Sequence, residues 1–69
     1  MALDRNVRYT VAEVLAEAGV SAEYSEKAGH GLNVGGLNVS SLDQTLRIPE
    51  AATVLHIVAP GLDLVEVSL

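Results

Sequence analysis

The chain has 69 residues, a net charge of −5 and no cysteine, and 49% of its residues are hydrophobic. This length allows one domain, residues 1–69, and the missing cysteine excludes disulfides, cysteine-ligated zinc and iron–sulfur clusters. Nine acids against four bases disfavour direct binding of nucleic acid, which needs clustered cations. So much aliphatic residue in so small a chain indicates that another chain covers part of the apolar surface.

No apolar run approaches the roughly 20 residues that span a bilayer. The first ten residues contain no apolar segment after their charges, so they do not read as a signal peptide. Together with the missing cysteine, this pattern leads us to expect an intracellular protein without a membrane partner.

Residues 11–18 are predicted to form a short helix. Apolar residues recur at helical spacing from Val11 to Ala18 and make one apolar face. Thr10 and Glu13 form the T-x-x-E pattern of a capping box, and Gly19 stands where a left-handed residue ends a helix. Before this helix, residues 6–9 fit either a short strand or an extended lead-in. After it, residues 22–27 are predicted to be an exposed strand or a polar loop.

The stretch LNV-GG-LNV, residues 32–39, predicts a tight hairpin. Two alternating triplets flank Gly35-Gly36, and a glycine pair is typical of a two-residue turn with positive φ. Pairing across this turn places Asn33 opposite Asn38, with the four aliphatic side chains on the other face. Residues 41–48 fit either a helical turn or a strand, and Pro49 ends whichever forms.

Residues 53–59 and 63–69 predict a second hairpin around Pro60-Gly61. A two-residue loop sets His56 opposite Val65, although Pro-Gly favours a type II turn and thus a wider loop. Both faces of this hairpin then carry aliphatic residues, and one helix covers only one face. We therefore expect a subunit or partner contact on it, at Val54, His56, Val58, Leu62, Leu64, Val65, Val67 and Leu69.

The sequence favours no catalytic, cofactor or metal site. His30 lies between two glycines and His56 within an apolar strand, and neither has an acid at a metal-ligand spacing. Ser40, Ser41 and Asp43 supply residue types of a nucleophile triad, but no G-x-S-x-G elbow is present. The glycines match turns better than a phosphate-binding loop.

The segment YTVAEVLAEAGV, residues 9–20, resembles the helix of β-grasp sulfur-carrier and ubiquitin-like proteins. This resemblance implies a small carrier or enzyme with a β-grasp-like core, although residues 1–9 leave no room for the opening hairpin of that fold. The same segment is similar to the first helix of MerR-type helix-turn-helix domains, which implies DNA binding. No basic recognition helix follows it, and the net charge disfavours that function.

The sequence predicts an α+β domain with one short N-terminal helix packed on an antiparallel sheet of about four strands, built from two hairpins. The favoured function is a non-enzymatic protein-interaction or assembly module. Its predicted partner is a second copy of the chain or another protein, as in a subunit of a larger assembly or an acidic inhibitor. The carrier or enzyme is the alternative.

Overall fold

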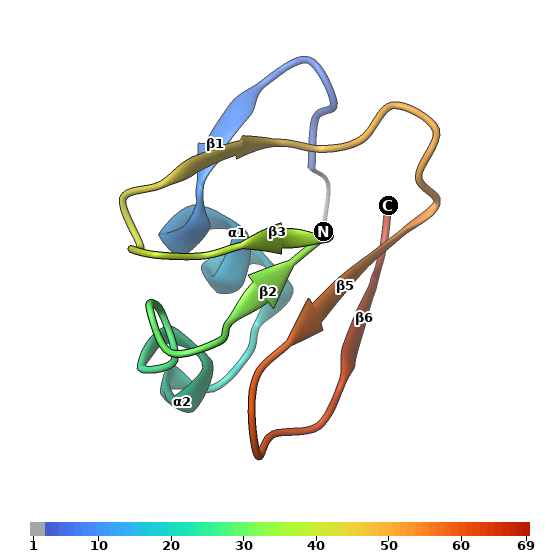
Figure 1. Ribbon diagram of the computed structural model, residues 1–69. Helices are drawn as coiled ribbons and strands as arrows, with labels where there is room; N and C mark the ends of the chain where they lie inside the picture. The colour runs from blue at the N-terminus through green and yellow to red at the C-terminus, as the bar shows by residue number, and fades with distance from the viewer. Residues whose placement is uncertain (1–2) are drawn as a thin grey trace.

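The computed structural model describes residues 3–69; Met1 and Ala2, which begin the segment considered for a signal peptide, lie outside the described residues. The fold is α+β (Figure 1). Its elements in chain order are β1 (Arg8–Thr10), α1 (Val11–Ala18), α2 (Ala22–Ser25), β2 (Asn33–Val34), β3 (Leu37–Asn38), β4 (Thr45–Arg47), β5 (Val54–Val58) and β6 (Val65–Ser68).

The helix predicted over residues 11–18 is confirmed as α1, with the predicted bounds and with Thr10 and Gly19 as its two caps. The Thr10 hydroxyl accepts from the backbone N–H of Glu13 at 3.2 Å, and the Glu13 carboxylate accepts from the backbone N–H of Thr10 at 2.9 Å. Gly19 ends the helix in the left-handed conformation with φ of 69°, and the N–H of Val20 donates to the carbonyl of Leu15. These bonds satisfy backbone groups that a helix of two turns otherwise leaves unpaired at its ends.

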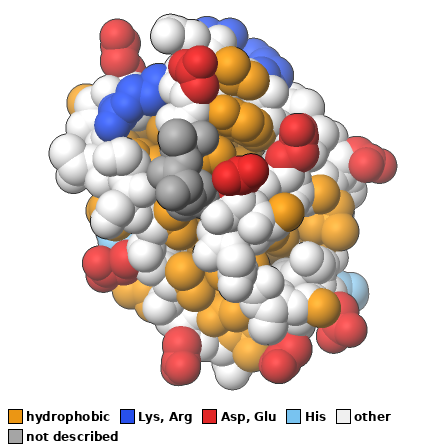
Figure 2. Space-filling view, turned by 180° about the vertical axis from the view of Figure 1, so that it is seen from behind, with side chains coloured by type: hydrophobic (Ala, Val, Ile, Leu, Met, Phe, Trp, Pro, Cys, Tyr) orange, Lys and Arg blue, Asp and Glu red, His pale blue; other side chains and the backbone are white. Residues whose placement is uncertain are grey.

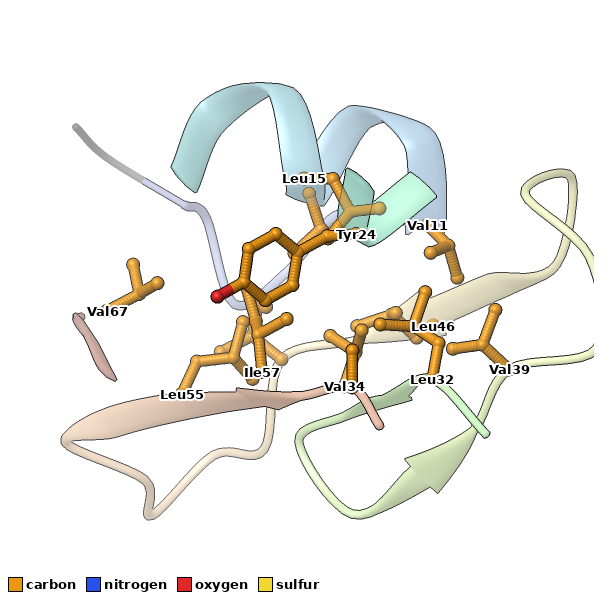
Figure 3. Close-up of a cluster of buried hydrophobic side chains, with 13 residues drawn as sticks. Val11, Leu15, Tyr24, Leu32, Val34, Val39, Leu46, Leu55, Ile57 and Val67 are labelled. Carbon is orange, nitrogen blue, oxygen red and sulfur yellow. The ribbon is translucent and has the colours of Figure 1, made fainter. Parts of the chain in front are cut away.

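The prediction of a strand or loop after α1 is wrong, because residues 22–25 form the one-turn helix α2. Tyr24, the one large side chain of this segment, is buried, and its hydroxyl donates to the carbonyl oxygen of Asp63 at 2.7 Å. A helical turn directs this ring into the core, as Figure 3 shows. Tertiary packing of one aromatic ring therefore overrides a weak alternating pattern.

The predicted antiparallel sheet is confirmed as four strands in the order β3-β2-β5-β6, built from the hairpins β2–β3 and β5–β6. A second, two-stranded sheet pairs β1 with β4. The sequence left the structure of residues 6–9 and 41–48 undecided, and this sheet shows that residues 8–10 and 45–47 are strands. In Figure 1 this small sheet lies at the top, and the β5–β6 turn lies at the bottom.

The Gly-Gly turn is confirmed. Gly35 and Gly36 have φ of 59° and 87°, and Val34 pairs with Leu37 across them. Asn33 pairs with Asn38 on the opposite face, where the two amides share a 3.0 Å hydrogen bond.

The predicted register of the second hairpin is wrong by one residue. His56 lies opposite Glu66, not Val65, and Leu55 lies opposite Val67. Pro60 and Gly61 do occupy a turn, closed by the N–H of Leu62 on the carbonyl of Ala59 at 3.1 Å, but the chain continues beyond that turn before it pairs. Because side chains alternate along a strand, the slip moves Val65 and Val67 onto the same face as Leu55.

The core lies between the two helices and the inner face of the four-stranded sheet, with the β1–β4 sheet closing one end (Figure 3). Its largest fully buried side chains come from α1, β2, β5 and the segment before β2, namely Val11, Val14, Leu32, Val34, Leu55 and Ile57. No helix within residues 3–69 is long and apolar enough to cross a membrane.

Candidate functional site

The outward face of the β5–β6 hairpin is solvent-exposed and partly apolar. The observed pairing aligns Val54 with Ser68 and His56 with Glu66, and the same register continued by one pair sets Val58 beside Leu64. Val58 is 45% exposed and Leu64 is 54% exposed, and large hydrophobic side chains with such exposure are few in residues 3–69. The hairpin thus presents two adjacent aliphatic side chains to solvent.

The predicted interface residues divide between the two faces. Val67 is buried in the core of its own chain, and Val65 also points inward. Leu62 and Leu69 are half-buried, and both pack against the core cluster. The outward set that the structure brings together consists of Val54, His56, Val58 and Leu64.

The free edge of β6 adds backbone groups to this surface. β6 is the outer strand of its sheet, and Leu69 donates its N–H to the carbonyl of Thr53 at 3.0 Å. Because bonded and non-bonded pairs alternate in an antiparallel ladder, Val67 and Val65 also direct their backbone groups to β5. Glu66 and Ser68 therefore direct theirs away from the sheet, where a further strand would pair.

His56 and Glu66 form the polar part of the outward face. The His56 Nε2 lies 3.8 Å from Glu66 Oε1, with the side chains 50% and 62% exposed. A contact between two side chains this exposed contributes little to stability. The two residues are better placed to contact solvent or a partner than to hold the hairpin together.

The residue types weighed for catalysis lie apart. Within residues 3–69, no three His, Cys, Asp or Glu side chains gather as a metal site would require. The Ser40 hydroxyl contacts the Gln44 side chain at 3.0 Å, and His30 is exposed in the loop before β2.

A cluster of arginines that the sequence did not predict lies at the β1–β4 end. Sequence proximity linked only Arg5 and Arg8, but the pairing of β1 with β4 sets Arg47 directly opposite Arg8. Figure 2 shows the molecule from behind: the Lys and Arg side chains visible there lie in its upper part, where Figure 1 has the β1–β4 sheet. No local signal reveals this cluster, because it depends on strands 39 positions apart (47 − 8).

Arg8 and Arg47 border a groove between the two sheets, with a volume of about 290 Å³. The aliphatic residues Val34, Leu37, Leu46 and Leu55 also line it. A second, open hollow of about 620 Å³ adjoins it at Arg47 and includes Arg5. Neither histidine lines these hollows.

Comparison of the chain with protein-family models, with curated protein sequences and with solved structures gives no match, so its fold and surfaces are the basis for assigning a function.

Proposed function

We propose that this chain is a self-associating assembly module whose contact surface is the outward face and free edge of the β5–β6 hairpin. This proposal rests on one observation: within residues 3–69 no strand pairs with the outer edge of β6, and two exposed aliphatic side chains, Val58 and Leu64, lie next to that strand. An edge strand is a template for another strand, and adjacent apolar side chains add a hydrophobic contribution to the same contact.

A second copy is the natural occupant, because an antiparallel pair of identical edges is self-complementary under a twofold axis. The register that sets Glu66 of one copy opposite Ser68 of the partner subunit uses the outward backbone groups of both residues. It also avoids placing two Glu66 carboxylates opposite each other, which like-charge repulsion disfavours. This arrangement covers the half-buried Val65 and Leu69 at the edge of the core.

Sedimentation equilibrium tests the proposal between about 1 µM and about 1 mM, a range that corresponds to association free energies of roughly −8 to −4 kcal/mol. We expect the mass to rise from monomer to dimer within it. In this register Leu64 lies at the end of the shared ladder, diagonal to Ser68 of the partner subunit. Leu64→Lys therefore places a charge at the edge of the contact and should shift the transition to at least about tenfold higher concentration, a change of roughly 1.4 kcal/mol.

Val7→Lys is the matched control, because Val7 is 42% exposed and precedes β1, away from the hairpin. It should leave the association unchanged. Ser68→Pro tests the edge separately, since it removes one outward N–H and proline is tolerated on edge strands. A monomeric mass throughout the range, or an equal effect of Leu64→Lys and Val7→Lys, would contradict the proposal.

A further inference from the structure

The β1–β4 sheet holds two like charges in the closest cross-strand position. Val11 donates its N–H to the carbonyl of Gln44 at 2.9 Å, so alternation makes Arg8 and Arg47 a pair without mutual backbone hydrogen bonds. Side chains approach most closely in such pairs, and like charges directly opposite each other are destabilising. The fold tolerates this repulsion in a sheet of only two strands.

No carboxylate relieves the repulsion within the described part of the chain. Within residues 3–69, the contact of His56 with Glu66 is the one found at 4.0 Å or less between a nitrogen of a basic side chain and a carboxylate oxygen. Arg5 directs its guanidinium to the backbone carbonyls of Pro49 and Glu50. The chain has nine acids and four bases, and three of the bases gather at this end. Glu50 lines the second hollow with Arg5 and Arg47, but within residues 3–69 no carboxylate oxygen lies within 4.0 Å of an arginine nitrogen. A local violation of charge pairing of this kind is typical of a binding site.

The groove beside these arginines combines cationic and apolar walls. Its aliphatic walls come from β2, β3, β4 and β5, and its volume of about 290 Å³ is near the lower end for a ligand site. That space suits one branched aliphatic side chain together with the groups next to it. Arg8 and Arg47 line the same groove and are both exposed, so anions that flank a bound side chain have access to these two residues.

We propose that this groove binds an acidic peptide segment of a partner protein, with one aliphatic side chain in the groove and flanking carboxylates on Arg8 and Arg47. Guanidinium groups bind carboxylates through paired, charge-assisted hydrogen bonds. A nucleic acid needs several clustered cations along its backbone, whereas a short acidic segment needs only the two arginines beside the groove, and its aliphatic side chain matches the aliphatic lining. This site is separate from the β5–β6 surface and does not depend on self-association.

The probe is the acetylated and amidated peptide Glu-Asp-Leu-Asp-Glu, titrated into the ¹⁵N-labelled protein and followed by NMR. We expect saturable shifts of the backbone amides of Arg8, Leu46 and Arg47. The isosteric peptide Gln-Asn-Leu-Asn-Gln should bind at least about tenfold more weakly, since charged hydrogen bonds exceed neutral ones. Replacement of the leucine in the acidic peptide by glycine should also weaken binding.

Arg47→Glu separates binding from folding. It turns a repulsive cross-strand pair into an attractive one, so the melting temperature should stay equal or rise while peptide affinity falls at least about tenfold. Lys27→Glu carries the same change in net charge, and Lys27 lines neither hollow, so this control should retain most of the affinity.

Four outcomes would overturn the inference. The first is equal binding of the acidic and amide peptides, and the second is unchanged affinity in Arg47→Glu. The third is tighter binding of inorganic phosphate or a short oligonucleotide at these amides, which would indicate a different ligand. The fourth is dissociation of a self-associated species by Arg47→Glu, which would place a second copy in the groove.

Discussion

Alanine at Gly35 and at Gly36 should have unequal effects, although both glycines have left-handed backbone angles. At φ of 59° and 87°, an L-residue costs roughly 1–2 kcal/mol at either position. A Cβ at Gly36 meets nothing within 4 Å, whereas a Cβ at Gly35 would lie 2.6 Å from Cδ1 of Leu55. Leu55 is 1% exposed, so it relieves the clash only by leaving its packed rotamer, toward the groove that it lines together with Gly35.

The clash adds the cost of overpacking a core, roughly 1–3 kcal/mol. Gly36→Ala should therefore lose roughly 1–2 kcal/mol of unfolding free energy, and Gly35→Ala roughly 2–5 kcal/mol. Since a small domain has a stability of about 5 kcal/mol, the second variant lies close to unfolding. The expected drop in melting temperature for Gly36→Ala is roughly 4–16 °C.

Thermal and urea denaturation followed by far-UV circular dichroism measures both losses. The gain from restricting the unfolded chain is the same for two Gly→Ala changes, so it cancels in the comparison. Leu55→Val removes the clashing methyl group, and Gly35→Ala combined with it should lose less than the sum of the two single changes. Equal losses for the two glycine variants, or strict additivity, would refute the packing argument.

Four further predictions concern the helices and the core. Thr10→Ala should lower the unfolding free energy by about 1 kcal/mol in urea titrations, because it removes the hydroxyl that caps α1; an unchanged midpoint would contradict this. Two hydrogen bonds hold the pKa of the Glu13 carboxyl below its ordinary 4.5. The larger effect comes from the backbone N–H of Thr10 and the smaller from the Thr10 hydroxyl. Their stabilisation is present above pH 4.5 and is lost as pH falls through the lowered pKa, so Glu13→Gln should flatten the fall of melting temperature below pH 4.5. Tyr24→Phe should cost about 1 kcal/mol in the same titrations, through the lost hydrogen bond to Asp63, and a stabilised variant would show that this bond is unimportant. Val67→Lys should give a random-coil circular dichroism spectrum at every concentration, because it buries a charge in the core; a folded monomer would contradict the inward placement of Val67.

The sequence by itself determined the elements whose causes lie within a few residues. The capping box of Thr10 and Glu13 and the stop at Gly19 fix α1, and Gly35-Gly36 fixes the register of β2 with β3. In each case the backbone angles and hydrogen bonds involve near neighbours in the chain, so the pattern contains the information that forms the element.

Only the tertiary structure decided the rest of the sheet arrangement. The β5–β6 pairing shifted by one residue from the turn-based expectation, because this shift buries Leu55, Ile57 and Val67 together on one face. The segment predicted as a strand or loop likewise forms α2, because the helical turn places the ring of Tyr24 in the core.

The arginine groove shows the same limit for a candidate site. Arg8 and Arg47 meet because β1 pairs with β4, an arrangement that gains its energy from burial of residues such as Leu46 between the sheets. Local propensity does not encode which distant strands pair, since many pairings satisfy the same alternation. The entropy cost of closing the long connection between β1 and β4, and the need to fill one shared core, select a single pairing of these strands. Arg8 and Arg47 come together only once that pairing has formed.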